Sequence, residues 1–164
     1  MSRPIKHTAQ TRPAPLSENL RRARADNAQE IAQDYVELIA DLIAADGTAR
    51  VTNLATRLGV THVTVNRTLR RLRRQGLVHV EPYRPITLTE AGRKLSEETR
   101  KRHQIVCEFL QSLGIPEAVA HSDAEGMEHH VSQYTLDAFV KHLKKASCKL
   151  GMRDHEKSSR DVPP

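Results

Sequence analysis

The sequence predicts a mainly α-helical protein that carries a single two-stranded β-hairpin, within a chain of 164 residues. Apolar residues recur at helical spacing, and glycines such as Gly47, Gly76 and Gly114 follow the last residue of each pattern. Two short runs, at 77–80 and 86–88, are rich in β-branched residues, and a turn with two prolines separates them. This order predicts a head of short helices with a hairpin, followed by a second helical module.

The head begins with an amphipathic helix that ends at Gly47. Its apolar face is formed by Ile31, Tyr35, Leu38, Ile39, Leu42 and Ile43. A short helix follows with Leu54, Ala55 and Leu58, and Gly59-Val60 supplies a turn. The next helix begins at about His62, buries Val65, Leu69 and Leu72, and has Gly76 as its C-cap.

The β-branched runs 77–80 and 86–88 predict a hairpin, because the turn 82–85 lies between them. Thr89 is a suitable N-cap for a long helix that reaches Leu113. Pro116 opens another helix in its first turn, and Ser132 caps a last helix that runs to about Ala146. Helix, short helix, turn, helix and hairpin together are the pattern of a winged helix-turn-helix.

The predicted division of the chain has four parts. The two ends lack periodic apolar residues, and the first carries Pro4, Pro13 and Pro15 among several arginines, so we expect both ends to be disordered. The parts are a basic arm, the winged helix-turn-helix domain, a second helical domain and a tail, at residues 1–25, 26–92, 93–146 and 147–164.

Charge indicates a polyanionic partner, because the net charge is +6 and the sequence pI is about 9.6. In the second helix of the helix-turn-helix pattern, arginines and threonines lie opposite the buried face, where Arg suits guanine or phosphate contacts. An exposed face balanced by neighbours is the alternative, but Glu81 is the only acid between Asp46 and Glu90. The predicted contacts to double-stranded DNA, the last at the wing tip, are Thr61, His62, Thr64, Arg67, Arg70, Arg71 and Arg84.

The remaining composition argues for a cytoplasmic protein. Cys107 and Cys148 are far apart and form no CxxC pair, which is typical of a reducing compartment. The start lacks an apolar leader, and no apolar run approaches ~18 residues, so we expect no membrane span. Neither a glycine-rich phosphate loop nor a nucleophile constellation is present, so we expect no enzyme and no small organic substrate.

Glu125, Glu128 and His129 follow an i, i+3, i+4 spacing, which gathers three donors on one face of a helix. Such a set suits a divalent ion such as Mn(II) or Fe(II), although a solvated polar face explains the spacing equally well. The pair Asp34 and Glu37 has the i, i+3 spacing, which by itself favours a solvated face. A lone histidine such as His103 is also more often structural.

Four features in this order resemble the manganese-responsive branch of the diphtheria toxin repressor (DtxR) family. They are the Asp34-Tyr35-x-Glu37 segment, the helix-turn-helix, the Arg102-His103 pair and the acidic-histidine segment 123–130. The resemblance implies a homodimeric, metal-activated repressor, whose second helical domain serves metal binding and dimerisation. It also implies a site for two Mn(II) ions per subunit at Asp34, Glu37, His103, Glu125, Glu128 and His129. His130 and Cys107 fall outside this set, and we interpret Cys107 as a packed thiol.

The expected function is therefore a regulator whose dimer, with Mn(II) bound, binds palindromic operators and represses manganese-uptake genes. Carboxylates at positions 34 and 125, where the iron-responsive branch has Met and Cys, favour Mn(II). The alternatives are a metal-independent winged-helix regulator and an iron-responsive repressor of the same family. A binuclear hydrolase is the third class, and the basic head argues against it. Pro85 stands where relatives commonly have Gly, so we expect an altered wing turn.

Overall fold

A computed structural model describes the backbone of residues 16–158, with side chains placed for most residues up to Ala146. The order of elements is helix α1 (Leu16–Asp46), α2 (Val51–Leu58), α3 (His62–Arg74), strand β1 (Val78–His79), β2 (Thr87–Leu88), α4 (Glu90–Ser112), α5 (Glu117–Met127) and α6 (Gln133–Ser158). The predicted mainly α-helical class with a two-stranded antiparallel wing is confirmed.

The helix ends follow the predicted signals. Gly47 and Gly59 adopt left-handed φ angles of 72° and 64° after α1 and α2. The hydroxyl of Thr89 accepts a hydrogen bond from the Gly92 backbone N–H at 3.0 Å, and that of Ser132 accepts one from Thr135 at 3.2 Å. Pro116 lies at the N-cap of α5, immediately before the first helical residue.

Two predictions about the ends of the chain are wrong within the described residues. Residues 16–25 belong to α1 instead of a disordered arm, and residues 147–158 continue α6 instead of forming a disordered tail. The segment from Leu16 to Asp46 contains neither glycine nor proline and is rich in Ala, Leu, Arg and Glu, so the helix can extend through residues 16–25, whose described side chains are exposed. Residues 1–15 and 159–164 lie outside the described residues.

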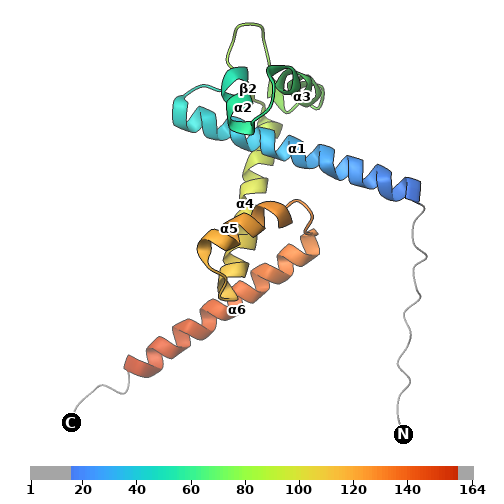
Figure 1. Cartoon of the computed structure of the whole chain (residues 1–164). Coiled ribbons are helices and arrows are strands. Elements are labelled where there is room, and N and C mark those ends of the chain that lie inside the picture. The colour runs from blue at the N-terminus through green and yellow to red at the C-terminus, as the bar shows by residue number, and fades with distance from the viewer. Residues whose placement is uncertain (1–15, 159–164) are drawn as a thin grey trace, which may run out of the picture.

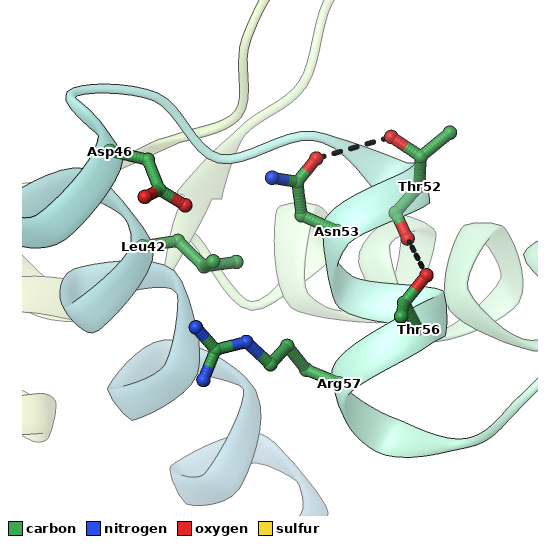
Figure 2. Close-up of a pocket in the computed structure, with 6 residues that line it drawn as sticks. All are labelled: Leu42, Asp46, Thr52, Asn53, Thr56 and Arg57. Carbon is green, nitrogen blue, oxygen red and sulfur yellow. Dashed lines mark hydrogen bonds between the residues drawn. The ribbon is translucent and has the colours of Figure 1, made fainter.

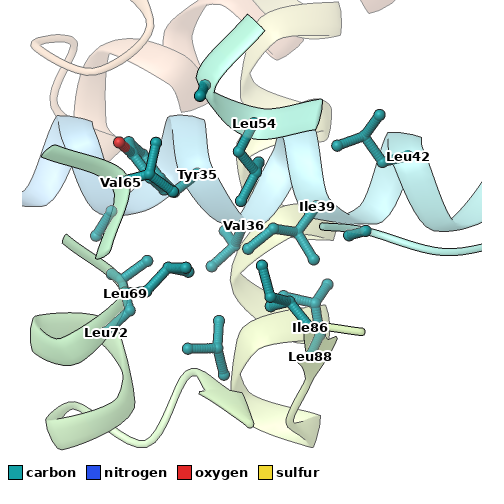
Figure 3. Packing of buried hydrophobic residues seen from close by; sticks show 14 residues of the cluster. Tyr35, Val36, Ile39, Leu42, Leu54, Val65, Leu69, Leu72, Ile86 and Leu88 are labelled. Carbon is teal, nitrogen blue, oxygen red and sulfur yellow. The ribbon is translucent and has the colours of Figure 1, made fainter. Parts of the chain in front are cut away.

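The head is built around α1, which runs across the view below α2 and α3 (Figure 1). Figure 3 shows apolar side chains of α1, α2, α3 and the wing meeting in one core. Its fully buried large members are Ile39, Leu54, Leu69, Leu72 and Ile86. The wing joins this core because Ile86 pairs with Ala49, and β1 pairs with β2 with Val78 opposite Leu88.

One residue of the wing turn has a left-handed conformation. Tyr83, whose side chain is fully exposed, takes a φ of 61°, the only positive φ of a non-glycine residue in the described chain. It lies two residues before Pro85. The wing still closes, because β1 and β2 remain paired below the turn.

Helix α4 connects the two halves of the molecule (Figure 1). Its first half packs on α1 and β2, and its second half packs on α5 and α6. A second core lies there, with Val106, Leu110 and Leu136 buried and the rings of Phe109 and Phe139 stacked at a centroid distance of 3.8 Å. The middle of α4 thus lies where the head meets the second module.

Candidate metal centre and nucleic-acid interface

The six predicted metal ligands come from three places in the fold. Asp34 and Glu37 lie on α1 and His103 on α4. Glu125 lies near the end of α5, Glu128 is the C-cap of α5, and His129 lies in the turn that follows. The last helical residue is Met127, but Glu128 keeps helical dihedrals (φ −58°, ψ −37°) and its backbone N–H donates to the Ala124 carbonyl at 2.9 Å. The end of α5 and the turn after it carry the side chains of Glu128 and His129 toward α1 and α4.

Four of the six side chains are in direct contact. The Nδ1 atom of His103 lies 2.6 Å from Oε2 of Glu128. The other carboxylate oxygen of Glu128, Oε1, is 3.6 Å from Nε2 of His129. That same nitrogen is 3.4 Å from Oδ1 of Asp34. A continuous chain of donor atoms therefore links α4 to α1 through the turn after α5.

Glu37 and Glu125 make no hydrogen bond or ion pair with the other four ligands within the described part of the chain. After burial, the charge of Glu125 is one of the causes that raise the pKa values of Asp34, Glu37 and Glu128. Glu37 faces the guanidinium of Arg100, with Oε1 3.9 Å from Nε, and Arg100 also pairs with Asp41. Arg100 is thus the cation that lies beside the cluster on the α1 side.

Burial and repulsion raise the pKa values of three of these carboxyl groups, Asp34, Glu37 and Glu128. The pKa of Glu128 is raised to about 7 by burial first and then by the charges of Glu125 and Asp34, against the opposing charge of Arg102. Burial likewise raises the pKa of Glu37 to about 7, with the nearby charge of Glu128 as the next cause. The pKa of Asp34 is also raised, first by burial. The side chain of Glu128 is only 3% exposed, so water gives its charge little stabilisation.

Two residues outside the predicted set fix the position of the ligands. Arg102 donates hydrogen bonds from Nη2 and Nε to the backbone carbonyl of Glu128, at 2.6 and 3.1 Å, and another to the carbonyl of Val131. These bonds hold the turn after α5 against α4. Gln33 is buried, and its Oε1 lies 2.9 Å from Nδ1 of His129. If His129 donates its Nδ1 proton to Gln33, its Nε2 lone pair faces Asp34 and Glu128.

The role of Gln33 could not be found from the spacing, because nothing in the sequence distinguishes a buried glutamine from a solvated one. His130, which the prediction left outside the ligand set, is 61% exposed and approaches Glu30 at 3.9 Å. Cys107 is buried as expected, but its sulfur also contacts His103 and His121. The i, i+4 spacing of His103 and Cys107 was the available signal for that contact, and His121 had none.

The predicted DNA contacts lie mainly on an exposed face of α3. Thr61 is the N-cap, and its hydroxyl accepts a hydrogen bond from the Thr64 backbone N–H at 3.2 Å. His62, Arg67 and Arg70 are exposed along the same helix. Their side chains are therefore free to meet a nucleic acid.

Two arginines of the predicted set have a different environment. Arg71 is half-buried, and its Nε and Nη2 atoms lie out of solvent without a hydrogen-bond partner among the described residues. A phosphate contact would require this side chain to move. Arg84 is exposed at the wing tip and pairs with Glu81 at 3.2 Å, a weak interaction that a phosphate can replace.

A hollow of about 350 Å³ lies in the head, away from the carboxylate cluster. Figure 2 shows its wall, in which the hydroxyls of Thr52 and Thr56 hydrogen-bond to the Asn53 side chain and the Thr52 carbonyl. Leu42, Asp46 and Arg57 complete the lining. This wall is mostly polar, whereas sites for small organic ligands are mostly apolar, so the hollow is a poor candidate for an effector site.

A winged helix-turn-helix joined to a second helical module through a partly buried carboxylate and imidazole cluster defines a DNA-binding regulator that responds to a metal ion. Comparisons with known proteins agree. Residues 29–86 match the family model "Iron dependent repressor, N-terminal DNA binding domain". Residues 89–151 match "Iron dependent repressor, metal binding and dimerisation domain".

Individual relatives are similar over most of the chain. The transcriptional regulator MntR of Escherichia coli is 51% identical over 122 residues, which cover 74% of this chain and 79% of the relative. MntR of Salmonella typhimurium is 50% identical over 123 residues, 75% of this chain and 78% of the relative. A solved "Manganese-dependent transcriptional repressor complex with manganese" is 31% identical with a TM-score of 0.58; the match covers 69% of this chain and 52% of that one.

The chain belongs to the DtxR family of iron-dependent repressors, within its MntR group. It is a metal-dependent, DNA-binding transcriptional repressor with a dimerisation domain, and its partners are DNA and a second copy of the chain. Among residues 16–158, no helix is long and apolar enough to cross a membrane.

Proposed function

We propose that the chain is a manganese-responsive repressor whose dimer, loaded with Mn(II), binds palindromic operators of manganese-uptake genes in the cytoplasm. One observation carries the proposal: a partly buried cluster, in which Glu128 is 3% and Asp34 45% exposed, joins α1, on the DNA-binding head, to α4 and the turn after α5, in the second module. The solved relative described as manganese-dependent, at 31% identity, supports the choice of metal.

The proposed ligands are Asp34, Glu37, His103, Glu125, Glu128 and His129. Four carboxylates and two imidazoles suit Mn(II), which favours oxygen donors, better than a metal that prefers thiolates. Four carboxylates would overcharge one divalent ion but would balance two, so we propose two ions per subunit. The raised pKa values of Glu37 and Glu128 support a cation site, because these buried groups need a positive partner in order to ionise.

A bound divalent ion supplies the positive charge that lets these carboxylates lie together in their ionised form. Asp34 and Glu37 then hold α1 against His103 and the turn after α5. Because α1 forms part of the head core, the orientation of α3 relative to the dimer module becomes fixed. A dimer with two fixed recognition helices can meet both half-sites of a palindrome together. By linkage, operator DNA must raise the metal affinity by the same factor.

The test is fluorescence anisotropy of a labelled operator fragment, titrated with the full chain under anaerobic, reducing conditions. The titration is done in chelator and then with Mn(II), Fe(II) and Zn(II). We expect tight binding with Mn(II) and loss of binding in chelator. Equal binding in all conditions would overturn the proposal in favour of a metal-independent regulator, and a preference for Fe(II) would favour an iron-responsive repressor.

Two variants and one matched control locate the site. His103→Ala and Glu125→Ala should abolish metal-dependent operator binding while the protein remains a folded dimer, as checked by circular dichroism and sedimentation. Asp123→Ala removes an exposed carboxylate from the same helix as Glu125 and should retain the full Mn(II) response. If either site variant keeps that response, the ligand assignment is wrong. Electron paramagnetic resonance of free Mn(II) then counts the ions bound per subunit.

A further inference from the structure

An arginine of α4 joins the two halves of the molecule beside the carboxylate cluster. The Nε atom of Arg100 lies 3.9 Å from Oε1 of Glu37, and its Nη2 atom contacts Oδ1 of Asp41. Glu37 and Asp41 are four residues apart on α1, so both carboxylates lie on the same side of that helix. One guanidinium therefore links two carboxylates of the DNA-binding head to α4, and one of these carboxylates is a proposed metal ligand.

Glu37 differs from the other proposed ligands in its partner. Four of the ligands contact one another, whereas the ion pair of Glu37 is with Arg100. After burial, the charge of Glu128 is the largest cause of the raised pKa of Glu37, and the charge of Arg100 opposes it. In the metal-free protein, the guanidinium thus supplies the positive charge that a bound divalent ion would supply to Glu37.

The surroundings of Arg100 let it change partner. The guanidinium of Arg102, two residues later, donates to the backbone carbonyls of Glu128 and Val131, which are fixed by the fold. Arg100 pairs with flexible side chains instead, and its own side chain is 47% exposed. Asp41 is 62% exposed, compared with 25% for Glu37, so it is the more accessible of the two carboxylates. The guanidinium can therefore keep Asp41 after it has left Glu37.

We propose that Arg100 is a resident cation that competes with the divalent ion for Glu37, and that Asp41 holds Arg100 when the ion is bound. The inference rests on the proposed function, because Glu37 is one of the proposed ligands. In the metal-free protein, the guanidinium pairs with both carboxylates. On metal binding, Glu37 exchanges the guanidinium for the ion, and Arg100 stays with Asp41 alone. The pair raises the Mn(II) concentration that the repressor needs, because it must separate before Glu37 can serve as a ligand.

The two partners of this device should change metal affinity in opposite directions. A partly exposed ion pair shifts an equilibrium by roughly 2–5-fold. Arg100→Gln removes the competing cation, so the Mn(II) affinity should rise by about that factor. Asp41→Asn removes the alternative partner and leaves the guanidinium with Glu37, so the affinity should fall by a similar factor.

The experiment measures the Mn(II) affinity of the full chain by electron paramagnetic resonance of free Mn(II), for the wild type, each variant and the double variant. Lys101→Gln is the matched control, because it removes the same charge from an exposed neighbour of Arg100 on α4. Its affinity should change less than that of Arg100→Gln. An unchanged or lower affinity in Arg100→Gln, or an equal rise in Lys101→Gln, would overturn the proposal.

The double variant separates a direct ion pair from the long-range effect of charge. Once Arg100 is Gln, Asp41→Asn should have no further effect, because there is no guanidinium to return to Glu37. Losses that simply add would show that the two charges act independently, and would overturn the proposal. If the wild type binds Mn(II) and operator as proposed while the variants match it, only this inference fails. A wild type that binds no Mn(II) would overturn both this inference and the proposed function.

Discussion

Glu128→Gln should make the metal-free protein more stable above neutral pH and leave it nearly unchanged in acid. Gln keeps the shape of the side chain and an oxygen acceptor for His103, but removes the buried charge. The folded-state pKa of Glu128 is raised from 4.5 to about 7. Protonated Glu128 therefore contributes stability that is fully present below about pH 4.5 and is lost as the pH rises through about 7.

The magnitude follows from these two pKa values. For one such carboxyl group, linkage lowers the free energy of unfolding by under about 1 kcal/mol at pH 5 and by roughly 3 kcal/mol at pH 8, relative to the protonated form. The charge of Glu128 is, after burial, the next cause of the raised pKa of Glu37, so this repulsion should not be counted twice. We therefore expect the variant to gain roughly 1–3 kcal/mol over the wild type at pH 8.

The assay is urea denaturation in chelator at pH 5 and pH 8, at one fixed protein concentration because the protein is a dimer. Asp123→Asn is the matched control, since it removes an exposed charge from the same helix and should change stability little at either pH. A variant that is no more stable than the wild type at pH 8 would refute the reasoning. An equal gain at both pH values would assign the effect to packing instead of charge. Added Mn(II) should make the wild type more stable than Glu128→Gln at pH 8, because it stabilises the wild type more than the variant.

Three further predictions follow from the contacts. Gln33→Leu removes the hydrogen-bond acceptor for His129 and should weaken Mn(II) binding by roughly 10–100-fold in a paramagnetic resonance titration. Gln33→Glu still accepts that hydrogen bond and should retain most of the affinity. Equal losses in both variants would show that this hydrogen bond does not support the ligand. Arg67→Ala should weaken operator binding by about 1–3 kcal/mol in anisotropy without changing Mn(II) affinity in the absence of DNA, and unchanged operator affinity would remove it from the interface. Gly92→Ala should cost about 1–3 kcal/mol or more in urea denaturation, because the added Cβ would collide with the backbone carbonyl that precedes β1. Gly126→Ala, where nothing lies within 4 Å, is its control and should be neutral or stabilising.

Much of the fold could be predicted because its signals are local. Glycines that adopt left-handed φ and hydroxyl side chains that cap helices act through neighbouring backbone atoms, so Gly47, Gly59, Thr89 and Ser132 marked helix ends correctly. The lengths of α1 and α6 were predicted wrongly, because both helices extend beyond the predicted bounds. The prediction required an apolar stripe for a helix, yet residues 16–25 are helical without one.

The ligand set was identified from a resemblance in sequence order, because spacing alone left Asp34, Glu37 and His103 with ordinary structural explanations. Where these residues lie is a tertiary property. The end of α5 and the turn after it bring Glu128 and His129 to α1 and α4, and helical spacing cannot show which other elements pack there.

The sequence by itself determined the order of the helices, the wing, the basic recognition helix and the types of donor available for a metal. Only the tertiary structure decided which donors meet. It paired Gln33 with His129, placed Arg100 beside Glu37, and gave His103 two different neighbours on its two ring nitrogens. The physical reason is distance: hydrogen bonds and burial act over a few ångströms, and residues about 90 positions apart come that close only after α1, α4 and α5 have packed.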